Sequence, residues 1–184
     1  MTVRQIALSA AAVLQADDIQ TALTVTTDPP EELTDPDALT LVKCVNLAAA
    51  ETASDFPCTV STDAESRDGL IPFSALGEAD TVREVTRHGR AVRFSTDSRG
   101  IRTPRDGTYT VTYTKPYAHV GADDELAVGA GADAEMLTYL AARNFCLITG
   151  RTDEASVWDQ RYNAEAENKR LRRRATLPRR AWLV

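Results

Sequence analysis

The chain has 184 residues, of which 43% are apolar and 26% charged, and its formal net charge is −6. This composition is typical of a globular protein, and no apolar run approaches the ~20 residues that a membrane-spanning helix needs. The three cysteines form no CxxC pair, and their odd number in a chain of this length argues against a disulfide framework. The N-terminal residues show no clear signal-peptide cleavage site, so we expect an intracellular protein in a reducing setting, without membrane contact.

The N-terminal part of the chain has a helical pattern. Residues 6–23 are rich in alanine and leucine and predict one helix, although Asp17 and Asp18 interrupt its apolar face. A loop with prolines and acids follows, and it ends in a helix start signal with Thr34 or Asp35 as the cap and Pro36 in the first turn. From 37 to about 55, apolar residues recur at three- and four-residue steps and define one buried stripe: Ala38, Leu41, Val42, Val45, Ala48 and Ala49.

Residues 58–120 change to a pattern of glycine, threonine and valine, which indicates β-structure. A hairpin is expected around His88-Gly89, with Val92 and Phe94 facing inward on the return strand. After a turn at Asp106-Gly107, the segment GTYTVTYT alternates aromatic or apolar residues with threonines. It therefore predicts a strand with one buried face and one hydroxyl face.

The C-terminal part returns to helical periodicity. The segment AEMLTYLAARNFCLIT predicts a helix that ends at Gly150 and buries Leu137, Leu140, Ala141, Asn144 and Ile148. A second, increasingly charged helix should run from 153 to about 174. Its inner face would consist of Ala155, Trp158, Tyr162 and Leu171.

These elements predict an α+β fold that is mainly an α-helical bundle with an inserted small antiparallel β region. We expect a single domain: N-terminal helices in 1–57, the β insertion in 58–120, a C-terminal helix pair in 121–175 and a tail in 176–184.

Candidates for catalysis are few. His88 lies in the predicted hairpin turn and His119 in a loop, and neither stands at metal-ligand spacing from another ligand-type residue. Cys146 lies among apolar helix residues, where a buried, inert thiol is the common case. The glycines of VGAGADAE lack the spacing and the lysine of a phosphate-binding loop. We therefore expect no enzymatic activity, no catalytic residues, no cofactor and no metal.

Charge is distributed unevenly along the chain. Residues 1–57 hold two basic and nine acidic residues, whereas KRLRRRATLPRR at 169–180 holds seven basic residues and no acid. Three interpretations of this basic segment compete: a solvated helix end, a protein-docking tail and a nucleic-acid contact. The apolar residues that follow favour docking on a protein partner. We expect the docking residues to be Arg172, Arg173, Arg174, Arg179, Arg180, Trp182 and Leu183.

The order of elements resembles a known family. The helix DPDALTLVKCVNLAAAETASDF, the β segment with DGLIPFSAL and TYTVTYTKPY, the helix-helix turn ITGRTDEASVWDQRY and the terminal RRAW together are similar to the head-to-tail adaptor (connector, head completion) proteins of tailed bacteriophages. The similarity covers most of the chain from Asp35 onward, and no catalytic signature is part of it.

The resemblance implies a structural virion protein in the neck region, assembled in the host cytoplasm. It implies a homo-oligomeric ring, usually of twelve copies, beneath the portal protein and in contact with a neck or tail protein. DNA would pass through the ring with transient, non-specific contact. Alternatives are a tail-completion or tail-terminator protein and, from the arginine-rich C-terminus, a regulatory nucleic-acid-binding domain.

Overall fold

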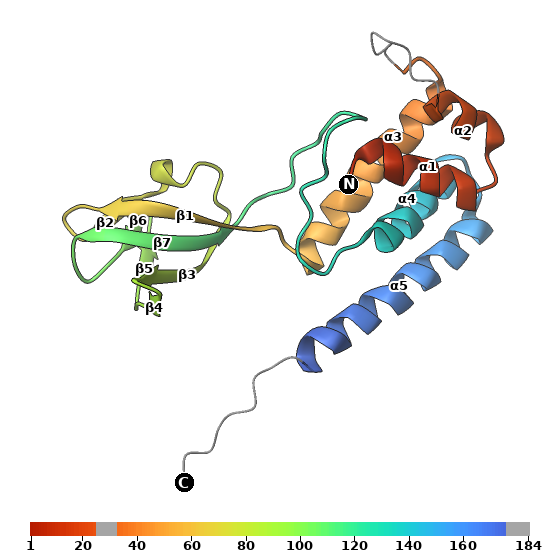
Figure 1. Cartoon of the computed structure of the whole chain (residues 1–184). Helices are drawn as coiled ribbons and strands as arrows, with labels where there is room; N and C mark the ends of the chain where they lie inside the picture. Colours follow the sequence, from red (N-terminus) through yellow and green to blue (C-terminus); the bar gives the residue numbers. More distant parts are fainter. Residues whose placement is uncertain (25–32, 176–184) are drawn as a thin grey trace. The chain divides into compact units, whose positions relative to one another are not determined.

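The structure is a computed structural model that describes residues 1–24 and 33–175, with side chains to residue 171. Contacts within the chain divide it into two units, one helical and one of β-strands (Figure 1). The helical unit contains Met1–Thr52, His119–Leu126 and the residues from Gly131 onward. The β unit contains Ala53–Ala118 and Ala127–Ala130. None of the helices in the described ranges combines the length and apolar character that a membrane span requires.

The first part of the helical unit is two helices, α1 (Val3–Val13) and α2 (Asp17–Thr24). The prediction of one helix over 6–23 is wrong, because Gln15 has a left-handed φ of 55° and ends the first helical run. Asp17 and Asp18 lie in the first turn of α2, where carboxylates stabilise the positive end of the helix dipole. The acidic pair that interrupts the apolar face therefore starts a new helix.

Helix α3 spans Pro36–Asp55 and begins as expected. The Asp35 carboxylate accepts a hydrogen bond from the Ala38 N–H at 2.7 Å, which confirms Asp35 as the cap. Leu41 and Val45 are fully buried in the predicted stripe.

Segment 119–126 is fastened to the helices by two polar side chains. The amide of Asn46, only 4% exposed, accepts from the Val120 N–H at 2.9 Å and donates to the Val120 carbonyl at 3.1 Å. The Arg4 guanidinium binds both carboxylate oxygens of Asp123, at 2.6 and 2.9 Å, and donates to the Leu23 carbonyl at 2.9 Å. Arg4 therefore joins α1 to the end of α2 and to this segment.

Helices α4 (Ala134–Ile148) and α5 (Thr152–Ala175) pack against each other around a turn at Gly150, whose φ is 79° (Figure 1). The predicted burial of Leu137, Leu140, Ala141 and Asn144 is confirmed, as is that of Ala155 and Tyr162, whereas Trp158 is half-buried.

Two expected core residues of this helix pair are exposed. Ile148 is 58% exposed and Leu171 is 55% exposed, so their prediction as inward residues is wrong. Ile148 lies in the last turn of α4. Asp133, the cap of α4, pairs with Lys169 of α5, so Leu171 extends beyond the start of α4. Both residues stand at the spacing of the buried face of their helix, but no described residue covers their side chains.

The β unit contains two antiparallel sheets among its described residues. One has the order β1-β7-β3-β4 and the other the order β2-β6-β5 (Figure 1). The strands are β1 (Thr59–Ser66), β2 (Leu70–Pro72), β3 (Thr81–Arg87), β4 (Arg90–Ala91), β5 (Ser95–Asp97), β6 (Gly100–Arg102) and β7 (Gly107–Thr114). A short 3-10 helix, η1 (Phe73–Ala75), follows β2.

The predicted hairpin and the predicted alternation are both present. His88 and Gly89 have φ values of 51° and 72°, as a two-residue turn of type I′ requires, although the return strand β4 is only two residues long. Along β7, Tyr109, Val111 and Tyr113 are buried. Thr108, Thr110 and Thr112 lie on the more exposed face, whereas Thr114 is buried.

The fold-class prediction of a mainly helical bundle with a small β insertion is wrong. The β unit has seven strands in its described residues and a hydrophobic cluster of its own. A region that only decorated a bundle would bury its apolar residues against the helices. Here they bury one another, so the fold is α+β with two cores. The cluster consists of Ala64, Ile71, Leu76, Val85, Ile101, Tyr109, Val111 and Tyr113.

The helical core makes a testable stability prediction. Leu140 is 1% exposed, so Leu140→Ala should lower the free energy of unfolding by about 2 to 5 kcal/mol through lost burial and the cavity left behind. Exposed Ile148 on the same helix is the control, and Ile148→Ala should change stability by no more than about 0.5 kcal/mol. Urea unfolding of both variants measures this difference. Equal midpoints would contradict the placement of Leu140 in the core.

Candidate functional site

The predicted docking residues are only partly within the described structure. Arg172, Arg173 and Arg174 belong to the end of α5, but their side chains are outside the described part. Arg179, Arg180, Trp182 and Leu183 lie outside the described residues altogether. Their role in docking stays a prediction.

The first residue of the basic segment is bound within the chain. The Lys169 ammonium lies 2.5 Å from the Asp133 carboxylate and 3.7 Å from that of Glu165. Burial alone would raise the pKa of Asp133, but the hydrogen bond from Lys169 and those from the Met136 and Glu135 N–H groups outweigh it and hold that pKa below its ordinary value. Lys169 therefore fixes helix α5 to the start of α4. The other basic residues of the segment 169–180 come after this fixed position in the chain.

Arg143 connects three helices of the same unit. Its guanidinium donates to Glu51 of α3 at 2.5 Å and to Asp159 of α5 at 3.1 Å. It also binds the side-chain oxygen of the neighbouring Asn144, whose amide donates to Glu51 at 3.2 Å. Sequence patterns do not predict this network, because its members are far apart in the chain and none belongs to a motif.

The surface of the α4–α5 pair combines aromatic and basic groups. The Tyr139 and Trp158 rings are stacked, with centroids 5.9 Å apart, and the Arg161 guanidinium lies 4.8 Å from the Trp158 ring centroid. Such a cation-π arrangement holds a charged side chain flat on an apolar surface.

Apolar side chains are also exposed on this helix pair. They include Leu147, Ile148 and Val157. A shallow hollow of about 320 Å³ lies between the helices and is lined by Arg143, Leu147, Thr152, Ala155, Ser156 and Asp159. Exposed apolar groups beside fixed charges are typical of a protein-binding surface.

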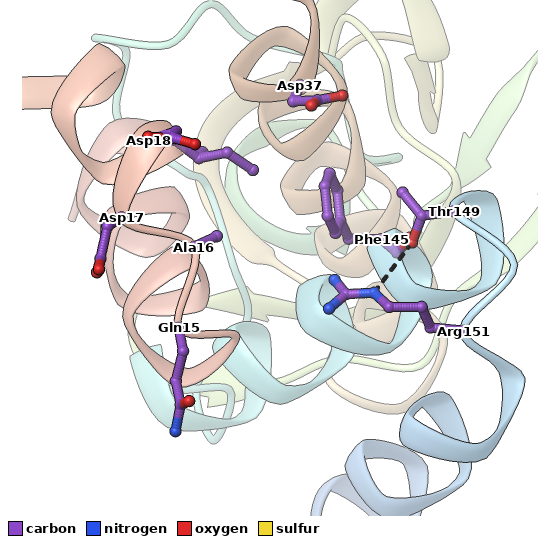
Figure 2. A pocket seen from close by; sticks show the side chains of 9 residues that line it. Gln15, Ala16, Asp17, Asp18, Asp37, Phe145, Thr149 and Arg151 are labelled. Carbon is purple, nitrogen blue, oxygen red and sulfur yellow. Dashed lines mark hydrogen bonds between the residues drawn. The ribbon is translucent and has the colours of Figure 1, made fainter.

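A second, more polar hollow of about 480 Å³ lies at the turn between α4 and α5 (Figure 2). Asp17 and Asp18 of α2 and Asp37 of α3 contribute carboxylates, and the Arg151 Nε donates to the Thr149 hydroxyl at 3.3 Å. In the ranges that the structure describes, no three residues of the types His, Cys, Asp and Glu are grouped as a metal site would require. The three carboxylates of this hollow are therefore not arranged as metal ligands.

The candidate catalytic side chains are dispersed. His88 belongs to the β unit and His119 to the helical unit. Cys44 and Cys146 are both buried. Burial, with a smaller effect from the nearby Cys146, raises the pKa of Cys44 to about 11, and burial also raises the pKa of Cys146. Raised pKa values suppress the thiolate, which is the nucleophilic form.

Comparisons with known proteins add no family assignment. The chain matches no protein-family model and no curated protein among those compared.

The Arg143 network predicts a measurable loss of stability. Arg143→Ala removes a guanidinium whose side chain is only 20% exposed and which binds Glu51, Asp159 and Asn144, so we expect a loss of roughly 1 to 3 kcal/mol. Arg67→Ala is the control, because the Arg67–Glu65 pair is exposed on both sides and exposed pairs contribute about 0 to 1 kcal/mol. Chemical denaturation of the two variants tests the ranking. A larger loss for Arg67→Ala would refute the joining role of Arg143.

The cysteines make a chemical prediction. At pH 8 Cys44 should not react with a thiol reagent in the native protein, because its raised pKa keeps the thiol protonated and burial blocks access. The folded state should lose stability as the pH rises from about 9 towards about 11, since the unfolded thiol ionises first. Mass spectrometry of labelled peptides, with urea-unfolded protein as the reference, measures the reactivity. Rapid native labelling of Cys44 would contradict this account.

Proposed function

We propose that this chain is a structural virion protein, the subunit of a head-to-tail adaptor ring that joins the portal protein to a neck or tail protein. The proposal rests on the resemblance in element order, from the helix at Asp35 through the β segment to the helix pair around Gly150. The strongest support comes from the α4–α5 pair. Apolar side chains are exposed on its surface, and α5 continues into a basic segment.

The geometry of α5 supports a docking function for its C-terminal end. Lys169 is fixed to the α4 cap, and directly after it the chain carries Arg170, Leu171 and three further arginines. Leu171 is 55% exposed, so an apolar residue stands among basic ones on the surface. A partner with an apolar pocket rimmed by carboxylates would complement this arrangement.

The acidic N-terminal part offers a counter-surface on a second copy. Asp17, Asp18 and Asp37 surround a hollow in the helical unit, and the acidic run 28–37 begins in residues outside the described part. Pairing of an acidic surface on one copy with a basic tail on the next is a heterologous contact, and such contacts generate rings when the rotation closes.

A tail-completion or tail-terminator protein is the alternative. A fold dominated by strands would favour it, but helices α1 to α5 span more of the described residues than strands β1 to β7 do. Electron microscopy of the chain mixed with candidate portal and tail proteins distinguishes the two. Closed rings on the portal support the adaptor, and binding only to the tail tip overturns it.

Deletion of residues 171–184 tests the docking model. These residues follow Lys169, which is bound to Asp133, so the truncated chain should keep its unfolding midpoint while it loses incorporation into portal-bound particles. Incorporation of the full chain should weaken with salt, because exposed charge pairs are screened over about 10 Å at 0.1 M.

Two full-length variants separate the contributions of charged and of apolar tail residues to docking. Arg179→Gln with Arg180→Gln removes charge, and Trp182→Ala with Leu183→Ala removes the apolar end. Normal incorporation of the truncated chain would show that the tail is dispensable. Failure of that chain to fold would place the tail in the core, and either result ends the docking model.

A further inference from the structure

Helix α5 buries few side chains for its length. Among its residues 152–171, only Ala155, Tyr162 and Ala166 are buried. Helix α4, by contrast, buries nine of its 15 residues. Two of the three buried side chains of α5 are single methyl groups, so little apolar area leaves the water when α5 packs on α4. Apolar packing alone therefore holds α5 weakly.

Two ion pairs add to this packing. The Arg143 guanidinium of α4 donates to Asp159 at 3.1 Å, and the Lys169 ammonium lies 2.5 Å from Asp133. The Asp159 and Asp133 side chains are 43% and 38% exposed, so water and dissolved ions reach both pairs. Partly exposed ion pairs are weak and are screened by salt. The hold of α4 on α5 should therefore depend on ionic strength.

The aromatic contact between the helices lies at the surface. The Tyr139 and Trp158 rings are stacked with their centroids 5.9 Å apart, and both side chains are half-buried. Water already reaches part of each ring, so separating them exposes less apolar area than opening a buried contact would. This contact therefore does not fix α5 as a core contact would.

The turn that joins α4 to α5 is short and open. Gly150 has a φ of 79°, and a Cβ at this position would have no atom within 4 Å. Glycine adopts left- and right-handed backbone conformations at little cost, so the chain direction can change here. Helix α4 also packs against α1, and this contact does not involve α5. Movement at Gly150 can therefore leave the core of the helical unit in place.

We propose that α5 is a detachable strap, a helix that leaves α4 as one segment about the turn at Gly150 while the rest of the chain stays folded. Salt favours the detached state, because it screens the ion pairs at Asp159 and Asp133. Detachment uncovers Tyr139 and the Arg143 guanidinium on α4, which α5 contacts in the docked state. Every contact involved lies within one chain, so this motion is independent of the proposed adaptor function.

Detachment has a direct signature in amide hydrogen exchange. A separate helix of such charged sequence is marginally stable in water, so the detached strap should lose its helical hydrogen bonds. Its backbone amides then exchange with solvent deuterium at a rate set by the population of the detached state. Exchange in α4 and in β7 requires opening of the two cores, so these strands and helices serve as internal references.

The test is hydrogen–deuterium exchange with mass spectrometry on the full chain, over a salt series at constant pH. Amides at 156–168 should exchange at least about tenfold faster than those of α4, at similar rates along the segment. Between about 0.05 and about 0.5 M potassium chloride, exchange in α5 should rise about threefold, because the ion pairs are screened. Exchange in α4 and β7 should stay the same.

Variants separate the ion pairs from the packing. Lys169→Gln and Asp159→Asn each remove one interhelical ion pair, so each should speed exchange in α5 about two- to fivefold and reduce its salt dependence. Tyr162→Ala removes apolar packing, so it should speed exchange about tenfold or more and keep the salt dependence. Arg67→Gln, which breaks an exposed ion pair in the β unit, is the control and should leave α5 unchanged.

Four results would each overturn the proposal. Equal exchange of α4 and α5, with the same response to salt, would show that they open as one unit. Protection that falls steadily from 156 to 168 would show fraying of the helix end instead of detachment. Exchange in α5 that ignores salt and both ion-pair variants would show that the ion pairs do not hold it. Unprotected α5 amides at low salt would show that no docked state exists.

Discussion

The position of α5 depends on ion pairs as well as on apolar packing. Helix α5 spans 24 residues but is strongly charged, and apolar packing through Ala155, Tyr162 and Ala166 covers only part of its length. Arg143 supplies what packing does not, since it binds a carboxylate of α3 and one of α5 from its place on α4. Further along α5, Lys169 binds the α4 cap. Polar contacts at Asp159 and at Lys169 therefore hold α5 against α4.

In the β unit, the side chain of Tyr109 has several structural roles. Tyr109 fills the core of this unit, its hydroxyl satisfies a loop carbonyl, and its ring lies beneath Arg87. A side chain that stabilises the fold therefore also orients a surface charge. Because the ring is rigid and buried, the guanidinium has few alternative positions.

Local signals in the sequence were sufficient for several features. Asp35 as a cap, the His88-Gly89 turn and the alternation along β7 each depend on residues within a few positions, and all are present in the structure. Features that need a distant partner were not predictable in this way. Periodicity places Ile148 on the buried face, but only the neighbouring elements decide whether that face is covered. The separate β core and the Arg143 network arise from pairings across many residues.

The ends of the β unit lie next to each other. Thr59 and Thr114 are register partners, and the Lys115 N–H donates to the Cys58 carbonyl at 3.1 Å. Segment 127–130 also returns to this point, where Gly129 lies against the Phe56 and Pro57 backbone so closely that a Cβ would clash. A segment that leaves and re-enters the chain at one place can be lengthened, shortened or exchanged in evolution without altering the path of the flanking residues. A fusion tag or reporter inserted at the outer turns of this unit should therefore be tolerated by the helices.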